Sequence, residues 1–112
     1  MHEAAITEGL VRTLLTEAAR HQISSIKQVT VKVGQLKAVE PHALKFCFEM
    51  FVEGTIAENA KLIIVHLTPI AICQQCSTKF EVPKFHFRCP QCDSNELKLL
   101  QGEELFIESF DV

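Results

Sequence analysis

Two pairs of cysteines constrain this 112-residue chain more than any other feature. Cys73 and Cys76 enclose two residues, as do Cys89 and Cys92, and twelve residues separate the pairs. Two residues between cysteines allow both sulfurs of a tight turn to face one ion, and two such turns complete a tetrahedron. Because four thiolates leave no open coordination position, the spacing predicts a structural Zn(II) site.

Two other uses of these cysteines remain open. Disulfides are one, although the chain begins with acidic residues and not with the positive charge of a secretory signal, which points to a reducing compartment. A rubredoxin-like iron site would use the same ligands, but Ser77 and Asp93 stand where such turns usually carry glycine, and the chain has no Tyr or Trp. The fifth cysteine, Cys47, lies on the apolar face of a predicted helix and is interpreted as a core residue.

The composition narrows the class of protein. A hydrophobic share of 47% with 22% charged residues is typical of a folded globular chain. The net charge of -3 argues against a protein that works mainly by neutralising phosphates. The longest apolar stretch, Leu62 to Cys73, is interrupted by polar residues and is too short to cross a bilayer. We therefore expect a cytoplasmic protein that binds neither membranes nor nucleic acid.

The periodicity of apolar residues predicts the fold class. A helical spacing runs from Ile6 and ends near His21, and a second helix begins at Pro41 and stops at Gly54. Strands are predicted at 26–33, 62–67 and 104–112. The expected structure is an α+β fold in which two helices lie on a three-stranded sheet, with a zinc-ribbon excursion between the last two strands. Residues 1–67 plus 96–112 would form the α+β domain, and residues 68–95 the zinc-binding domain.

Several short motifs, taken in order, resemble the HypA/HybF family, the nickel metallochaperones of [NiFe]-hydrogenase maturation, which in some organisms also serve urease. The matching segments are Met1-His2-Glu3, Gly54-Thr55, Cys73-x2-Cys76, Cys89-Pro90-x-Cys92 and Gly102-Glu103-Glu104-Leu105. The resemblance spans essentially the whole chain, and among its motifs only the cysteine quartet is specific alone. Ala4, where relatives often carry a larger apolar residue, and Asp93, where glycine is common, depart from the pattern without touching a proposed ligand.

The resemblance implies that nickel binds at Met1, His2 and Glu3 in the α+β domain. The chemistry agrees, because the Met1 amine, the His2 backbone nitrogen and the His2 imidazole can form fused chelate rings, with the backbone nitrogen of Glu3 as a further donor. All-nitrogen sets suit Ni(II) and Cu(II), and the first N–H groups of a helix lack intrahelical acceptors. The plainer interpretation is that His2 and Glu3 are exposed residues before a helix, with Glu3 favoured by the helix dipole. His86 is a further candidate donor, on the hypothesis that a mobile ribbon brings it near.

The implied function is a binding and delivery protein, with Ni(II) as transient cargo and Zn(II) as structural ion. The implied partners are a HypB-type GTPase and the hydrogenase large-subunit precursor; a homodimer is left open. No nucleophile–base pair or phosphate-binding glycine loop is found, so we predict that the chain is not an enzyme. The alternative is a zinc-ribbon nucleic-acid-binding or transcription-associated module. The acidic balance and the lack of an aromatic–basic interleave count against it.

Overall fold

The computed structural model describes residues 2–112, which form two α-helices, a short 3-10 helix and six strands. In chain order the elements are α1 (Glu3–Arg20), β1 (Gln28–Gly34), η1 (Gln35–Lys37), α2 (Pro41–Phe51), β2 (Lys61–Leu67), β3 (Ile70–Cys73), β4 (Lys79–Glu81), β5 (Leu97–Gln101) and β6 (Leu105–Asp111). None of the described helices is long and apolar enough to cross a membrane.

The chain divides into two compact units. The first, here called the helical unit, contains residues up to Lys32, Val39–Val65 and Phe106–Val112. The second, here called the ribbon unit, contains Val33–Ala38 and His66–Leu105. The ribbon unit takes in the predicted zinc-binding segment 68–95 together with 96–105, because β5 returns to pair with β3.

Helix α1 is stabilised by its apolar stripe, on which Val11, Leu14 and Ala18 are buried. It ends at Arg20, close to the predicted end, and the next turn places Gln22 in the left-handed region at φ 56°. Helix α2 begins after Glu40, whose carboxylate accepts the Ala43 N–H at 2.6 Å in the manner of an N-cap.

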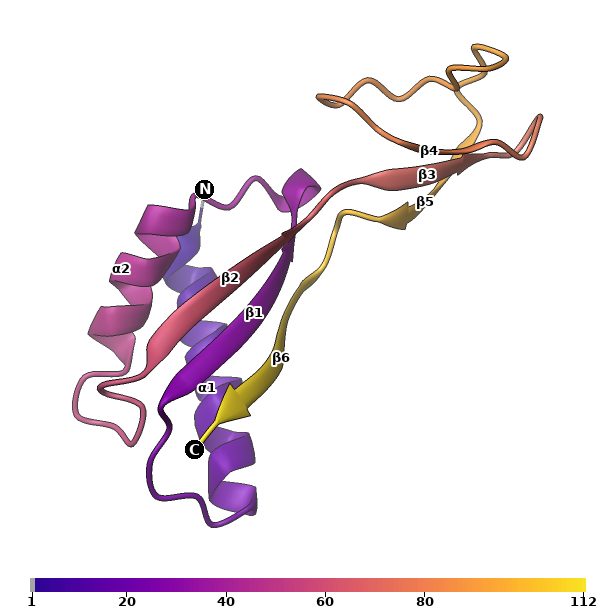
Figure 1. Ribbon diagram of the computed structural model, residues 1–112. Helices are drawn as coiled ribbons and strands as arrows, with labels where there is room; N and C mark the ends of the chain where they lie inside the picture. The colour runs from indigo at the N-terminus through magenta and orange to yellow at the C-terminus, as the bar shows by residue number, and fades with distance from the viewer. Residues whose placement is uncertain (1) are drawn as a thin grey trace. The chain divides into compact units, whose positions relative to one another are not determined.

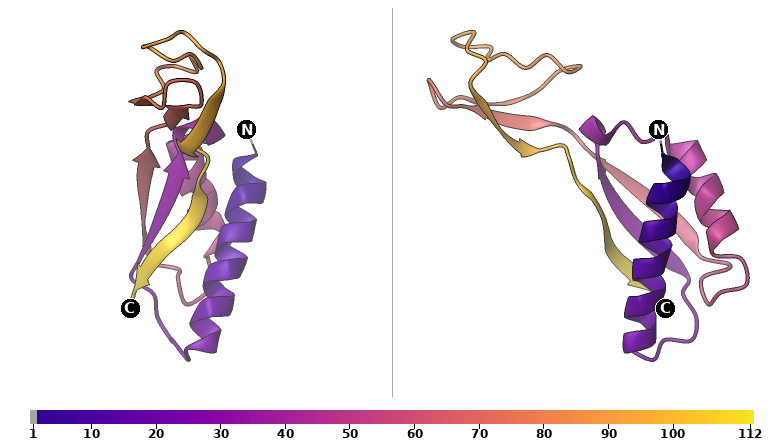
Figure 2. Two further views of the ribbon diagram at one scale, coloured as in Figure 1. Left: turned by 90° about the vertical axis from the view of Figure 1, so that its right-hand side faces the viewer. Right: turned by 180° about the vertical axis from the view of Figure 1, so that it is seen from behind.

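The first sheet has the strand order β2-β1-β6. Its central strand buries Val29, Val31 and Val33, each 1% exposed, so the predicted alternation is confirmed. Strand β6 runs antiparallel to β1, since the Lys27 N–H donates to the Asp111 carbonyl and the Gly34 N–H to the Glu104 carbonyl, both at 2.8 Å. Both helices lie on one side of this sheet, as the views from two sides agree (Figures 1 and 2). The predicted arrangement of two helices on three strands is therefore confirmed.

The ribbon unit contains a second sheet of order β4-β3-β5 that the sequence did not predict. Both pairings are antiparallel, with Ile72 opposite Lys79 on β4 and Cys73 opposite Leu97 on β5. The turn between β3 and β4 carries the first cysteine pair, and the loop between β4 and β5 carries the second. The segments that connect the strands of the small sheet thus carry both cysteine pairs.

Candidate metal centres

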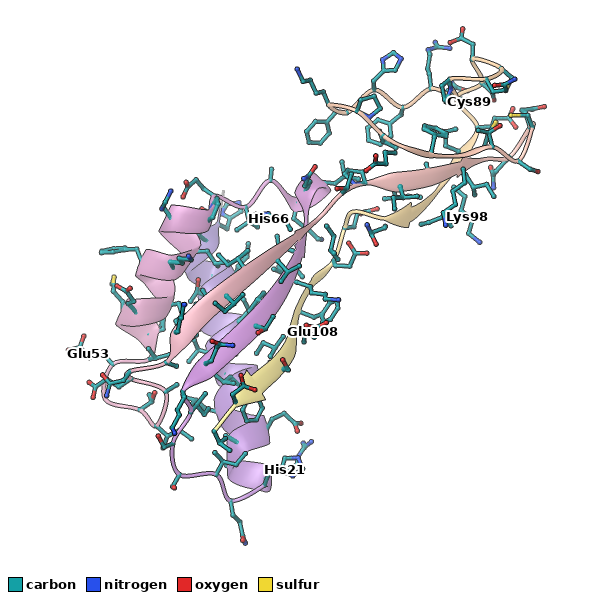
Figure 3. All side chains as sticks on the ribbon, viewed as in Figure 1. His21, Glu53, His66, Cys89, Lys98 and Glu108 are labelled. Carbon is teal, nitrogen blue, oxygen red and sulfur yellow. The ribbon has the colours of Figure 1, made fainter. Side chains whose placement is uncertain are left out.

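The four paired cysteines converge on one point of the ribbon unit. The Cys73 and Cys92 sulfurs lie 3.6 Å apart and those of Cys76 and Cys89 lie 3.5 Å apart, and all four lie within 4.8 Å of one another. A tetrahedral ion with Zn–S bonds of about 2.3 Å requires sulfur–sulfur distances of about 3.8 Å. The donor set therefore fits a tetrahedral thiolate site such as that of zinc. Figure 3 shows sulfur atoms gathered beside the labelled Cys89.

The two cysteine turns have the same local geometry. The Ser77 N–H donates to the Cys73 carbonyl and the Asp93 N–H to the Cys89 carbonyl, both at 2.9 Å. Ser77 and Asp93 occupy the left-handed region, at φ 65° and 62°. Glycine is favoured in this conformation. The two turns therefore keep the left-handed backbone geometry although serine and aspartate stand in place of glycine.

Backbone N–H groups in both turns point at sulfur. The Gln75 N–H lies 3.4 Å from the Cys73 sulfur, and the Gln91 N–H lies 3.3 Å from the Cys89 sulfur. Hydrogen bonds of this kind favour the thiolate over the thiol, which is the form that binds metal. Cys73 and Cys89 are buried, whereas Cys76 and Cys92 are exposed. One sulfur of each pair is therefore shielded from solvent.

The thiols hold very different pKa values when no cation is present. The hydroxyl and N–H of Thr78 lower the pKa of Cys76 to about 6. The Cys76 N–H likewise lowers the pKa of Cys73. Although the Ser94 N–H favours the Cys92 thiolate, desolvation and the neighbouring thiols raise the pKa of Cys92 to about 12. Four adjacent thiolates therefore require a bound cation, and metal binding must displace protons.

Cys47 lies outside this cluster. It is half-buried on α2, in the helical unit, and does not belong to the group of ligand atoms that the other four cysteines form. The prediction that it is not a fifth ligand agrees with this position.

The predicted nickel ligands lie at the start of α1. Met1 falls outside the described residues. His2 is the exposed N-cap residue, and its carbonyl accepts the Ile6 N–H at 3.0 Å. Glu3 is the first helical residue and is buried. Its carbonyl accepts the hydroxyl of the buried Thr7 at 2.6 Å.

The Glu3 carboxylate has a structural partner that sequence reasoning missed. The Glu40 N–H, at the start of α2, donates to it at 3.0 Å. This hydrogen bond is the main cause that lowers the pKa of Glu3 below its ordinary value. The two residues are 37 positions apart, and no local pattern connects them. The carboxylate thus links the beginnings of the two helices within the helical unit.

Comparison with known proteins identifies the family. A family model described as "Hydrogenase/urease nickel incorporation, metallochaperone, hypA" matches residues 1–112. The chain belongs to the HypA family. The Hydrogenase maturation factor HypA of Azotobacter chroococcum mcd 1 is 39% identical over 112 residues, covering 100% of this chain and 99% of that protein. The HypA of Caldanaerobacter subterraneus subsp. tengcongensis is 36% identical over 113 residues.

A solved HypA structure has the same fold. The structure described as "Solution structure of the Ni metallochaperone HypA from Helicobacter pylori" matches with a TM-score of 0.73 at 26% identity, covering 99% of this chain and 97% of that chain. Membership of the HypA family makes the chain a metallochaperone for nickel incorporation into hydrogenase or urease, and a maturation factor instead of an enzyme. The predicted family resemblance is thereby confirmed over the whole chain.

Proposed function

We propose that this chain binds Ni(II) at its N-terminus, through Met1, His2 and the backbone of Glu3, and delivers it during [NiFe]-hydrogenase maturation, with urease as a second client. The observation that carries the proposal is the match of the nickel-incorporation family over residues 1–112, which includes the Met1-His2-Glu3 segment. The exposed His2 at the beginning of α1 supports it, because cargo that must be passed on has to remain accessible.

The bonding of Glu3 supports a backbone role for this residue. Its carboxylate accepts the Glu40 N–H, so the side chain already has a structural task. That bond ties the Glu3 side chain to the start of α2 and leaves the backbone nitrogen of Glu3 as the donor that we assign to nickel. Square-planar nitrogen sets suit Ni(II), and raw affinity in such a set would favour Cu(II). Nickel selectivity therefore comes from metal availability and from partner proteins.

The proposal includes a structural Zn(II), which is held by Cys73, Cys76, Cys89 and Cys92. The distances of 3.5 and 3.6 Å between sulfurs support a tetrahedral ion, and the four sulfurs complete its coordination. Zinc then stabilises a ribbon that has little apolar core of its own, and apparent binding free energies of about 10–16 kcal/mol are typical of such sites. The proposed setting is the cytoplasm, and the proposed partners are a HypB-type GTPase and the hydrogenase large-subunit precursor.

Nickel titration of untagged protein by calorimetry tests the ligand assignment. We expect His2→Ala, or one glycine added before Met1, to abolish nickel binding while the zinc content measured by atomic emission stays unchanged. His21→Ala is the matched control, since His21 is an exposed histidine at the other end of α1. His86→Ala, in the same titration, tests the hypothesis of a further donor. A glycine-extended protein that binds nickel as tightly as the native one would refute the assignment.

A further inference from the structure

The ribbon unit carries a turn whose residues are poorly suited to its backbone. Between β4 and the second cysteine pair, the His86 N–H donates to the Pro83 carbonyl at 2.7 Å. The two central residues, Lys84 and Phe85, have φ values of 41° and 62°. Positive φ at both central positions characterises a type I′ turn, for which Asn-Gly is the favoured sequence. Lysine and phenylalanine are disfavoured at positive φ, so this turn is a local backbone strain. Strained backbone conformations of this kind cluster at functional sites.

An exposed aromatic pair stands on this turn. Phe85 is 60% exposed and Phe87 is 42% exposed, and their ring centroids lie 6.4 Å apart in an edge-to-face arrangement. Solvent-facing aromatic side chains of this size are enriched where a partner binds. The two rings pack against each other, and both remain accessible to a partner.

A cavity of about 510 Å³ opens in the same loop. Phe80, Pro83 and Pro90 supply apolar lining, and Glu81, His86 and Arg88 supply polar groups. A volume in this range, with a few convergent polar groups among apolar ones, is typical of ligand sites. The cavity lies wholly within the ribbon unit and is bounded on one side by Cys89 and Cys92 of the second cysteine pair. Among the described residues, His2 and Glu3 do not line it.

The charges around the turn favour an anionic partner. Lys79, Lys84 and Arg88 lie within ten residues that contain one acid, Glu81, in a chain whose net charge is -3. Arg88 is paired with Asp93, with a nitrogen–oxygen distance of 3.8 Å. Within residues 2–112, neither Lys79 nor Lys84 takes part in an ion pair, so these two lysines carry the positive charge that a partner can meet. The expectation that the chain lacks an aromatic–basic interleave is thus wrong for the segment 84–88, where Lys84, Phe85, His86, Phe87 and Arg88 follow one another.

A peptide fits this mixture of charges better than a nucleic acid does. Single-stranded nucleic acids are bound by a continuous basic groove with stacked aromatics, and the carboxylates of Glu81 and Asp93 line the cavity here. A peptide can offer backbone N–H groups to Glu81 and carboxylates to Lys84 at the same time. Its apolar side chain can fill the cavity between Phe80 and Pro90.

We propose that the turn Pro83–Arg88 and the adjoining cavity form a docking site for an acidic polypeptide segment of a partner protein, with one large apolar side chain of that segment in the cavity. Docking goes beyond the nickel site proposed at Met1, His2 and Glu3, because none of these three residues belongs to the turn and neither His2 nor Glu3 lines the cavity. His86 alone belongs to both hypotheses, and the nickel titration of His86→Ala decides its part as a donor. Loss of docking and loss of nickel binding are therefore separable: a His2→Ala protein should dock normally.

The test selects peptides from a random phage-displayed 12-residue library on immobilised, zinc-loaded full-length protein. Enriched peptides should carry net negative charge and one large apolar residue. A labelled enriched peptide is then measured by fluorescence anisotropy. Phe85→Gly should weaken binding at least tenfold although it relieves the backbone conformation at φ 62°, so a loss cannot be attributed to unfolding. Lys84→Glu should weaken binding and reduce its salt dependence.

Phe46→Ser on α2 is the matched control. The exposed fraction of Phe46, 64%, is similar to that of Phe85, but Phe46 lies in the helical unit. It should leave peptide binding unchanged. The proposal is overturned if selection on the native protein enriches no peptide beyond those that selection on the Phe85→Gly protein enriches. It is equally overturned if the enriched peptides are cationic or lack an apolar residue, or if Phe46→Ser causes the same loss of binding. It is also overturned if a labelled 20-nucleotide oligothymidylate binds and Phe85→Gly releases it, which would assign the turn to nucleic acid.

Discussion

At the scale of single residues, Glu3 has two tasks that lie on different atoms. Its carboxylate accepts the Glu40 N–H at 3.0 Å and so ties the start of α1 to the start of α2. Its backbone nitrogen, one position after His2, belongs to the proposed nickel site. The motif Met1-His2-Glu3 predicted the second task through the family resemblance, whereas the first depends on a contact across 37 positions that no sequence pattern encodes.

The carboxylate of Glu3 should make the stability of the helical unit depend on pH. The Glu40 N–H holds the pKa of Glu3 below its ordinary value of 4.5 in the folded protein. The unfolded chain therefore binds this proton more readily, so the stabilisation is present above the unfolded pKa and is lost as pH falls through the folded pKa. Glu3→Gln should lower the melting temperature most near neutral pH and by less below about pH 4.5.

Thermal unfolding of the native protein and of Glu3→Gln, compared at each pH, measures this difference. Acid also releases metal from thiolates, but both proteins share that effect, so it cancels in the comparison. A difference between the two melting temperatures that stays constant from neutral to acidic pH would show that the ionised carboxylate contributes nothing.

At the scale of elements, the periodicity of apolar residues predicted the long helices and strands but not the short strands. Helix α1 and strand β1 each bury one face of a long regular pattern, and both were predicted within a few residues of their observed bounds. The strands β3, β4 and β5 were missed. Strand β4 has three residues and β3 has four, too few for an alternation to be recognised. Their pairing depends on the cysteine turns that hold the ribbon together, which is a tertiary constraint.

Two glycines in different elements should respond oppositely to alanine. A Cβ at Gly34, the last residue of β1, would lie 2.1 Å from the carbonyl carbon and oxygen of Gly102, and those are backbone atoms that cannot rotate away. A Cβ at Gly9, within α1, would meet nothing within 4 Å. Gly34→Ala should therefore destabilise the protein by about 2–3 kcal/mol or more, because the backbone segments at Gly34 and Gly102 must move apart. Gly9→Ala should stabilise it by about 0.5–1 kcal/mol.

Urea unfolding of both variants checks this pair. Gly34 also donates its N–H to the Glu104 carbonyl at 2.8 Å, and separation of the chains would lengthen that bond. Equal effects of the two substitutions would mean that the close approach of Gly34 and Gly102 is absent in solution.

At the scale of the whole molecule, the two units are stabilised by different physics. The helical unit has an apolar core in which Leu14, Val29 and Leu44 are almost fully buried. Apart from Val33 of β1, the buried hydrophobic residues of the ribbon unit are Ala71, Cys73, Val82 and Cys89, so cysteine sulfurs take the place of large apolar side chains. Hydrophobic burial should hold the first unit without metal, whereas the second depends on ligation by its thiolates.

Removal of the metal from the thiolates should therefore unfold one unit and spare the other. After metal is stripped by a thiol-reactive reagent and EDTA, hydrogen exchange should show loss of amide protection across β3, β4 and β5, while α1 and the centre of β1 stay protected. The circular dichroism of the helices should change little for the same reason. Cys73→Ser should reproduce the stripped state, and Cys47→Ser, a half-buried cysteine on α2, is the matched control that should keep both metal and protection. If α1 lost its protection together with the ribbon, the apolar core would be too weak to fold alone, and the metal would be part of the folding of the entire chain.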